Sequence, residues 1–213
     1  MILAAWVLGI FAVLGTGLVA LTFNATEERI AANERAALLA NLNALVPADR
    51  YDNALTEDSV QVVDPALLGT SEPVTVYRAY RDGKPVAVLG APVAPDGYSG
   101  SIRLLVGVYA DGTLAGVRVL AHHETPGLGD AIDVSRSDWI LGFADKSLER
   151  PTEAGWGVKK DGGIFDQFTG ATITPRAVVK AVHRFLLYFR QHRDKLFAKS
   201  TPGGLEASSG ETP

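Results

Sequence analysis

The first 26 residues carry no charged side chain, and this restricts the start of the chain more than any other feature. Residues 1–23, "MILAAWVLGIFAVLGTGLVALTF", form one continuous apolar run. As a helix, such a run reaches about 30 Å or slightly more, which is enough to cross a lipid bilayer. Its three glycines do not oppose this, because glycine is common in membrane helices. The run predicts a transmembrane anchor over residues 1–23.

A cleaved secretory signal peptide is the alternative interpretation of this run. It is disfavoured because no basic residue precedes the run, the run is too long, and no A-x-A cleavage pattern follows. A retained anchor is therefore predicted. Its orientation is not set by charge, because Arg29 and Arg35 are mixed with acidic residues and no basic residue lies on the other side.

The residues after the anchor have helical periodicity. Asn24 and Glu27 have the spacing of a capping box, and Leu38, Leu42 and Leu45 fall on one face. A helix is therefore predicted over 24–46, ended by proline 47. Residues 24–70 as a whole are predicted to be a helical connector that leads to a folded domain over 71–199.

Residues 74–121 read as four strands in two hairpins. The segments 74–80 and 85–91 flank an Arg-Asp-Gly turn, and the segments 101–109 and 113–121 flank an Ala-Asp-Gly turn. Two such hairpins predict an antiparallel sheet. The segment "GYSG", 97–100, is a glycine-punctuated entry to the third strand.

The end of the chain is predicted to be mainly helical. Ser137 is a suitable N-cap for a short helix over 138–143, and 156–160 reads as a short strand. Thr174 followed by Pro175 predicts the start of a long helix, whose apolar stripe would pack on the sheet. Residues 200–213 have the composition of a disordered tail.

Composition excludes several classes of function. The net charge is −4, so nothing indicates a surface for nucleic acid. The chain has no cysteine, which excludes disulfides, thiolate metal sites and cysteine-ligated iron–sulfur clusters. The four histidines do not have a zinc-binding spacing, so no metal site is predicted.

The stretch "DQFTGATIT", 166–174, is the strongest candidate for a functional site. Its hydroxyl side chains and small Gly-Ala pair come directly before a helix, whose N-terminus favours a phosphate group. No Lys-Ser or Lys-Thr follows the glycine, so a P-loop for a diffusible triphosphate is not present. From "TGAT" alone, a simple helix cap and turn remains the better interpretation.

Wider motifs change that balance. "DQFTGATIT" is similar to the attachment motif of covalent flavin-binding domains, and "GYSG", "ETPGLG" (124–129) and "VKKDGG" occur in the expected order around it. Over residues 1–195 the chain resembles the RnfG family, the G subunits of Rnf electron-transport complexes. The C subunit of the Na⁺-translocating NADH:quinone oxidoreductase shares the TGAT-type motif. Many members have serine where this chain has Thr169.

The resemblance implies an α+β fold, with a single N-terminal transmembrane helix followed by an FMN-binding domain in which helices pack on an antiparallel sheet. It implies covalent FMN, joined as a phosphoester to Thr172. It also implies a loop that supports the flavin ring and an acidic residue that helps a flavin transferase to recognise its acceptor. The residues it assigns to cofactor binding are Thr172, Thr169, Gly170, Ala171, Asp166, Glu124, Thr125, Gly127, Leu128 and Gly129.

The function that the resemblance implies is electron carriage within an ion-translocating ferredoxin:NAD oxidoreductase. The expected partners are the other membrane and iron–sulfur subunits of the complex, a flavin transferase and membrane lipid. The expected location is the bacterial inner membrane, with a single span and the flavin domain on the periplasmic side. No independent turnover is expected, since the chain has no dinucleotide fingerprint. The alternative is a membrane-tethered binding or assembly module of the same fold without a covalent cofactor.

Overall fold

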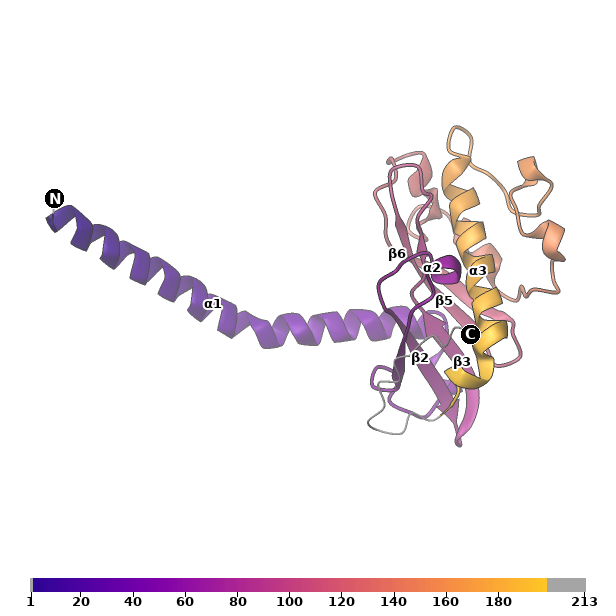
Figure 1. The fold of residues 1–213 in the computed structure, drawn as a ribbon, viewed down its shortest axis with the longest axis horizontal. Helices are drawn as coiled ribbons and strands as arrows, with labels where there is room; N and C mark the ends of the chain where they lie inside the picture. Colours follow the sequence, from indigo (N-terminus) through magenta and orange to yellow (C-terminus); the bar gives the residue numbers. More distant parts are fainter. Residues whose placement is uncertain (1, 199–213) are drawn as a thin grey trace, which may run out of the picture. The chain divides into compact units, whose positions relative to one another are not determined.

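The computed structural model describes residues 2–198, and the chain divides into two units, residues 1–40 and 41–213. The tail predicted to be disordered, 200–213, lies outside the described residues. The first element is one unbroken helix, α1 (Ile2–Asn43), drawn in indigo and purple in Figure 1. The predicted start of a separate helix at Asn24 is therefore wrong. The apolar run before Asn24 is itself helical, so no free helix end exists there for a cap to satisfy.

Within residues 2–198, no helix combines the length and apolarity that crossing a membrane requires.

The residues between α1 and residue 74 form several short elements rather than one helix. They contain the 3-10 turn η1 (Ala48–Arg50), the strand β1 (Ser59–Val62) and the one-turn helix α2 (Pro65–Leu68). The side chain of Asp64 caps α2 by accepting a hydrogen bond of 3.0 Å from the Leu67 N–H. These elements belong to the second unit, which begins at residue 41.

A six-stranded antiparallel sheet forms the centre of the second unit. Its strands are β1, β2 (Val74–Arg81), β3 (Lys84–Gly90), β4 (Val93–Ala94), β5 (Ile102–Tyr109) and β6 (Leu114–Ala121). The order is β1-β2-β3-β5-β4, and β6 also pairs with β5. Both predicted hairpins, β2–β3 and β5–β6, are confirmed.

The long helix α3 (Ile173–Leu196) lies across one face of this sheet and creates the core (Figure 1). Val178, Val182 and Phe185 point inward and are fully buried, as the predicted apolar stripe requires. They belong to one cluster with strand residues such as Val88 and Val106. Full burial of one such side chain stabilises the fold by about 1.5–3 kcal/mol. The α+β class predicted from the sequence is therefore correct for this unit.

Four 3-10 segments connect β6 to α3: η2 (Gly129–Ile132), η3 (Asp138–Phe143), η4 (Glu153–Gly155) and η5 (Lys159–Asp161). The predicted cap at Ser137 is confirmed, since its side chain accepts a hydrogen bond of 3.2 Å from the Trp139 N–H. The predicted strand at 156–160 is wrong. Only one bridge, between Val158 and Phe165, forms there, because the chain turns back through η5 and Gly162.

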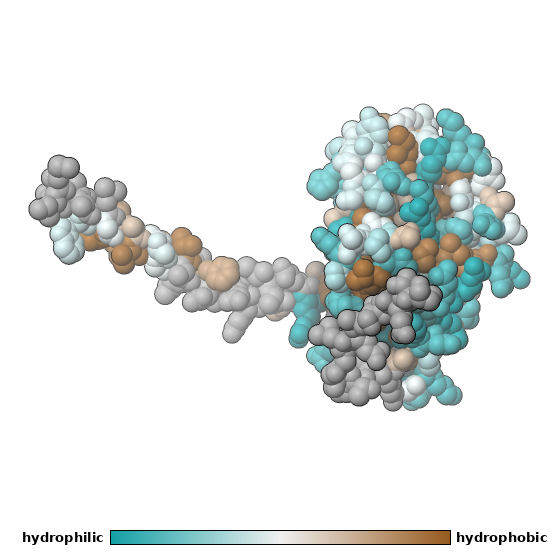
Figure 2. Space-filling view, in the orientation of Figure 1, coloured by the Kyte–Doolittle hydropathy of each residue, from teal (hydrophilic) through white to brown (hydrophobic). Residues whose placement is uncertain are grey.

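The visible surface of the second unit is mostly hydrophilic, with small separate apolar islands (Figure 2). Scattered apolar residues of this kind are normal on a protein surface.

Gly90 provides a test of how tightly α3 packs on the sheet. A Cβ atom at Gly90 would overlap with the Cζ and Cε2 atoms of the buried Phe185 ring. We expect Gly90→Ala to lower the free energy of unfolding by about 1–3 kcal/mol, because a packed core accommodates extra volume poorly.

Gly142→Ala is the matched control, because a Cβ atom there would meet nothing within 4 Å. Urea unfolding of both variants measures the effect. Equal stabilities for the two variants would contradict this description of the α3–sheet contact.

Candidate functional site

A buried carboxylate brings together three segments that are far apart in sequence. Glu124 follows β6 and has only 4% of its surface exposed. Its Oε1 accepts a hydrogen bond of 3.0 Å from the Ser99 N–H, and its Oε2 accepts one from the Thr174 hydroxyl. The loop before β5, the loop after β6 and the first turn of α3 are thus joined at one side chain.

Two glycines allow this close approach. A Cβ atom at Gly129 would lie 2.7 Å from Oε2 of Glu124 and 2.8 Å from Oγ1 of Thr174. A Cβ atom at Gly97 would lie 2.9 Å from Oε1 of Glu124. A larger residue at 129 would push Glu124 and Thr174 away, and one at 97 would collide with Glu124 and with the Gly100 carbonyl oxygen, which lies 2.2 Å from such a Cβ atom. The close packing around Glu124 therefore explains a glycine in each of the "GYSG" and "ETPGLG" motifs.

The loop after Glu124 is a tight turn that exposes its tip. The Thr125 carbonyl accepts hydrogen bonds of 3.1 Å from the N–H groups of Leu128 and Gly129. Gly127 has φ +78°, a left-handed conformation that glycine adopts without strain. Thr125 and Leu128 are exposed, and Leu128 retains 44% of its surface.

The TGAT segment forms a second turn beside this loop. The Ala171 N–H donates to the Phe168 carbonyl at 3.1 Å, and Gly170 has φ +81°. A Cβ atom at Gly170 would lie 3.5 Å from Cδ2 of Leu128, so the two turns adjoin. Thr169 and Gly170 are exposed, whereas Ala171 is half-buried.

The start of α3 differs from the prediction. The N-cap is Thr172 rather than Thr174, and its side chain makes no capping hydrogen bond. Thr174 lies inside the first turn and is fully buried, because its hydroxyl is directed to Glu124. Pro175 follows at the third helical position. A backbone N–H there would have no partner within the helix, so proline costs no hydrogen bond. The half-buried Thr172 hydroxyl is the one left available at the helix start.

Two exposed ion pairs involve residues that flank the TGAT segment in sequence. Lys159 Nζ lies 2.6 Å from Asp166 Oδ1, and Arg176 forms a bidentate pair with Asp161 at 2.6 and 2.9 Å. Hydrogen bonds from the Arg176 guanidinium lower the pKa of the Asp161 carboxyl. Asp166 is 68% exposed, so a macromolecule that approaches the turn can reach it.

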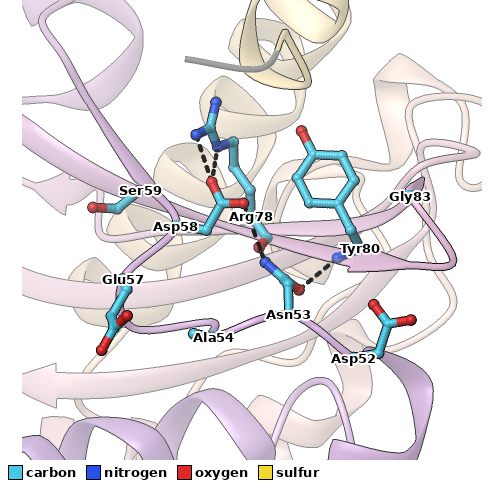
Figure 3. Close-up of a pocket in the computed structure, with 9 residues that line it drawn as sticks. All are labelled: Asp52, Asn53, Ala54, Glu57, Asp58, Ser59, Arg78, Tyr80 and Gly83. Carbon is cyan, nitrogen blue, oxygen red and sulfur yellow. Dashed lines mark hydrogen bonds and ion pairs between the residues drawn. The ribbon is translucent and has the colours of Figure 1, made fainter. Parts of the chain in front are cut away.

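A separate polar cavity of about 600 Å³ lies beside β2 (Figure 3). The Arg78 side chain donates to Asp58 and, at 2.6 Å, to the carbonyl of Ala198. Asn53 bridges Asp58 and the backbone of β2, accepting from the Tyr80 N–H at 2.8 Å. These groups satisfy one another's hydrogen bonds, and they connect the segment before β1 with β2 and with the residues after α3. We interpret this cavity as part of the structural framework and not as a binding site.

The structure thus brings the predicted site residues into two adjoining turns. Glu124, Thr125, Gly127, Leu128 and Gly129 form one turn, and Asp166, Thr169, Gly170, Ala171 and Thr172 form the other. Three contributors were not predicted as site residues. Ser99 donates to Glu124, Thr174 connects the helix to Glu124, and Ile173 is 45% exposed beside Thr172. Within residues 2–198, no group of three acidic, histidine or cysteine side chains is arranged to hold a metal ion.

Two family models match parts of this chain. A family model of the FMN-binding domain matches residues 97–187, which include both turns, and a model of the RnfG N-terminal region matches residues 1–45. Three curated relatives are each named as the G subunit of an ion-translocating oxidoreductase complex. That of Pseudomonas aeruginosa is 52% identical over 202 residues, 95% of this chain and 94% of that protein. That of Pseudoalteromonas atlantica is 50% identical over 194 residues, 91% and 90%. That of Vibrio cholerae is 49% identical over 196 residues, 92% and 93%.

Thr174 and Thr172 can be separated by matched substitutions. Thr174→Val keeps the side-chain shape but removes the donor to the buried Glu124, so we expect a loss of about 1–3 kcal/mol in the free energy of unfolding. Thr172→Val removes a hydroxyl that makes no capping bond, so its stability should stay within about 0.5 kcal/mol of the wild-type value. Chemical denaturation measures both, and the reverse order would contradict the assigned roles.

Proposed function

Since this chain belongs to the family of G subunits of ion-translocating oxidoreductase complexes, we propose that it carries electrons on an FMN bound covalently to Thr172. The observation that carries the proposal is the state of the Thr172 hydroxyl. It stands at the N-cap of a long helix, makes no capping bond, and adjoins a glycine turn within the FMN-binding match. It is therefore available for a phosphoester bond.

The start of α3 suits the phosphate of such a bond. The N–H groups of Ile173 and Thr174 begin the helix and have no carbonyl partner within it, and Pro175 has no N–H. A phosphodiester at Thr172 would carry about one negative charge beside the positive helix end, which stabilises it by about 0.3–1 kcal/mol when exposed. The Thr172 side chain accepts no hydrogen bond from these N–H groups. Both donors are therefore available to a phosphate attached at Thr172.

Exposed apolar side chains near Thr172 suit the flavin ring. Leu128, on the turn that adjoins Gly170, and Ile173, the residue after Thr172, have 44% and 45% of their surfaces exposed. A Cβ atom at Gly127 would meet nothing within 4 Å, so the loop leaves open space there. We propose that these residues, with the Thr125 hydroxyl, hold the ring. When bound, FMN would supply one- and two-electron redox chemistry, while the chain positions it.

Covalent attachment has a physical advantage at an exposed site. The two turns lie at the surface, and the side chains beside Thr172 are only partly buried. A shallow site of this kind holds a diffusible ligand weakly, because it buries little of the ligand's surface. A phosphoester prevents loss of the cofactor. We propose that a flavin transferase forms it and that the exposed Asp166 carboxylate takes part in recognition.

We further propose that the protein acts as a subunit and not alone. The relatives are named as subunits of a complex, and we infer that this chain exchanges electrons with other membrane and iron–sulfur subunits. Residues 1–23 would anchor it in the bacterial inner membrane, with the flavin domain in the periplasm. The uncharged start of the chain and the match of residues 1–45 to the RnfG N-terminal region support the anchor.

The covalent bond is tested by co-expression of the full chain with a flavin transferase. We expect an intact mass above the sequence mass by one FMN minus water, and a band that fluoresces under ultraviolet light after denaturing electrophoresis. Thr172→Ala should lose both signals, because it removes the hydroxyl proposed to form the phosphoester, while the Thr174 hydroxyl is bonded to Glu124.

Thr152→Ala is the matched control. Thr152 is also an N-cap residue without a side-chain capping bond, and it lies on a different segment. It should retain the added mass. A colourless wild-type protein would overturn the carrier function and favour the alternative of a binding or assembly module without cofactor.

The membrane anchor is tested by flotation. Membranes from cells that express the full chain are treated with alkaline carbonate and spun in a density gradient. The full chain should float with the lipid, because an apolar helix stays inserted when peripheral contacts are removed. A variant without residues 1–23 should stay at the bottom of the gradient. Flotation of that variant would show that the run is not the anchor.

A further inference from the structure

Trp139 contacts the flavin attachment segment from outside its sequence motif. It lies in η3, 27 residues before Asp166, and its indole N–H donates to the Asp166 carbonyl at 2.8 Å. Its ring also packs edge-on against the ring of Phe168, with centroids 5.2 Å apart. One side chain thus contacts two residues of the D-x-x-T sequence that precedes Thr172.

The attachment segment has few other connections to the rest of the domain. Phe165 is well held, since its N–H and its carbonyl bond to Gly157 and Lys159 at 3.1 and 2.7 Å. From 166 to 170, the backbone–backbone bond that forms is the local one between Phe168 and Ala171. The side chain of Gln167 accepts a hydrogen bond of 3.2 Å from the Lys160 N–H. Phe168 also packs against the hydrophobic core, and Trp139 adds a hydrogen bond and a ring contact to this sparsely bonded segment.

The ion pair of Asp166 does not replace that restraint. The two side chains of this pair, Lys159 and Asp166, are 57% and 68% exposed. Pairs this exposed contribute little to stability, because water screens them and both side chains lose entropy. The pair can also exchange for contacts with another protein, so it leaves the Asp166 carboxylate accessible.

Trp139 is itself held firmly. Its backbone N–H donates to the Ser137 side chain at 3.2 Å. Its ring packs in a T-shaped arrangement with the ring of Phe143, with centroids 5.3 Å apart. Phe143 is fully buried and stacks on Phe165 with centroids 4.5 Å apart. These contacts connect the indole to the core on one side and to the exposed segment on the other.

We propose that Trp139 is a positioning residue for flavin attachment. It fixes the backbone between Asp166 and Thr169, so that the Asp166 carboxylate and the Thr172 hydroxyl are presented to the flavin transferase in one arrangement. A preordered acceptor spares the enzyme the entropy of ordering the segment on binding. The inference rests on the proposed function, because it concerns the same attachment reaction.

The reaction itself needs a flavin activated as a pyrophosphate, such as a flavin dinucleotide. Oγ1 of Thr172 forms a bond to the phosphorus on the flavin side, and the P–O bond to the second phosphate breaks. A nucleoside monophosphate leaves, and the hydroxyl proton passes to a base of the transferase. Trp139 takes no part in these bonds and acts only through the shape of the acceptor.

The test compares the full-length apoprotein in detergent with two variants, using purified flavin transferase and flavin adenine dinucleotide. Trp139→Phe keeps an aromatic ring beside Phe168 and removes the hydrogen bond to the Asp166 carbonyl. We expect the initial rate of FMN incorporation, followed by intact mass, to give a kcat/KM about three- to tenfold lower, mainly through a higher KM for the apoprotein. With long incubation, the final mass should equal that of the wild-type protein.

Trp156→Phe is the matched control. Trp156 belongs to the same aromatic cluster, and its indole N–H also donates to a carbonyl, that of Ser147 at 3.2 Å. Its indole bond goes to Ser147 and not to residues 166–170, so the incorporation kinetics of Trp156→Phe should match those of the wild type. Melting temperatures of both variants separate a loss of stability from a loss of presentation.

The outcomes are distinct. Wild-type kinetics in Trp139→Phe would overturn the positioning role while leaving the proposed function intact. Equal slowing in both variants would also overturn it, since a general loosening of the aromatic cluster would then be the cause. A wild-type chain that gains no FMN mass would overturn both the proposed function and this inference.

Discussion

The site depends on the buried carboxylate of Glu124. Burial of a charged or polar group costs free energy unless hydrogen bonds compensate it, and Glu124 finds its donors on two other segments, at Ser99 and Thr174. The loop before β5, the loop after β6 and the start of α3 must therefore come together for the carboxylate to be satisfied. Glycine at 97 and 129 leaves room for this arrangement, because a Cβ atom at either position would overlap with a carboxyl oxygen of Glu124.

This constraint assigns the hydroxyl groups at the helix start to different tasks. Thr174 is committed to Glu124 and is removed from water. Thr172 is left as an N-cap residue whose side chain does not cap, which is an unusual use of a threonine at that position. The separation of a structural hydroxyl from an available one within three residues is the basis of the proposed attachment chemistry.

The sequence predicted much of the fold, and the structure brings the predicted site residues into two adjoining turns. The hairpins followed from their turn signals, the apolar stripe of α3 followed from periodicity, and the motifs around Thr172 were recognised by resemblance. The short elements β1, β4 and α2 were not predicted, because they contain too few residues for a period to show. The cap was placed two residues late, at Thr174. A Thr-Pro pair is a good local start signal, but local propensity does not include a buried acceptor fifty residues away.

The sequence by itself determined the class of the domain, the long apolar start and the motif that contains Thr172. All three depend on patterns of residues that are close together in the chain. Tertiary structure alone decided which threonine is free, that the two turns adjoin through Leu128 and Gly170, and that Trp139 supports Asp166. These features depend on side chains that meet across large separations in sequence. Their geometry is set when the sheet, the 3-10 segments and α3 pack together, and no local pattern records it.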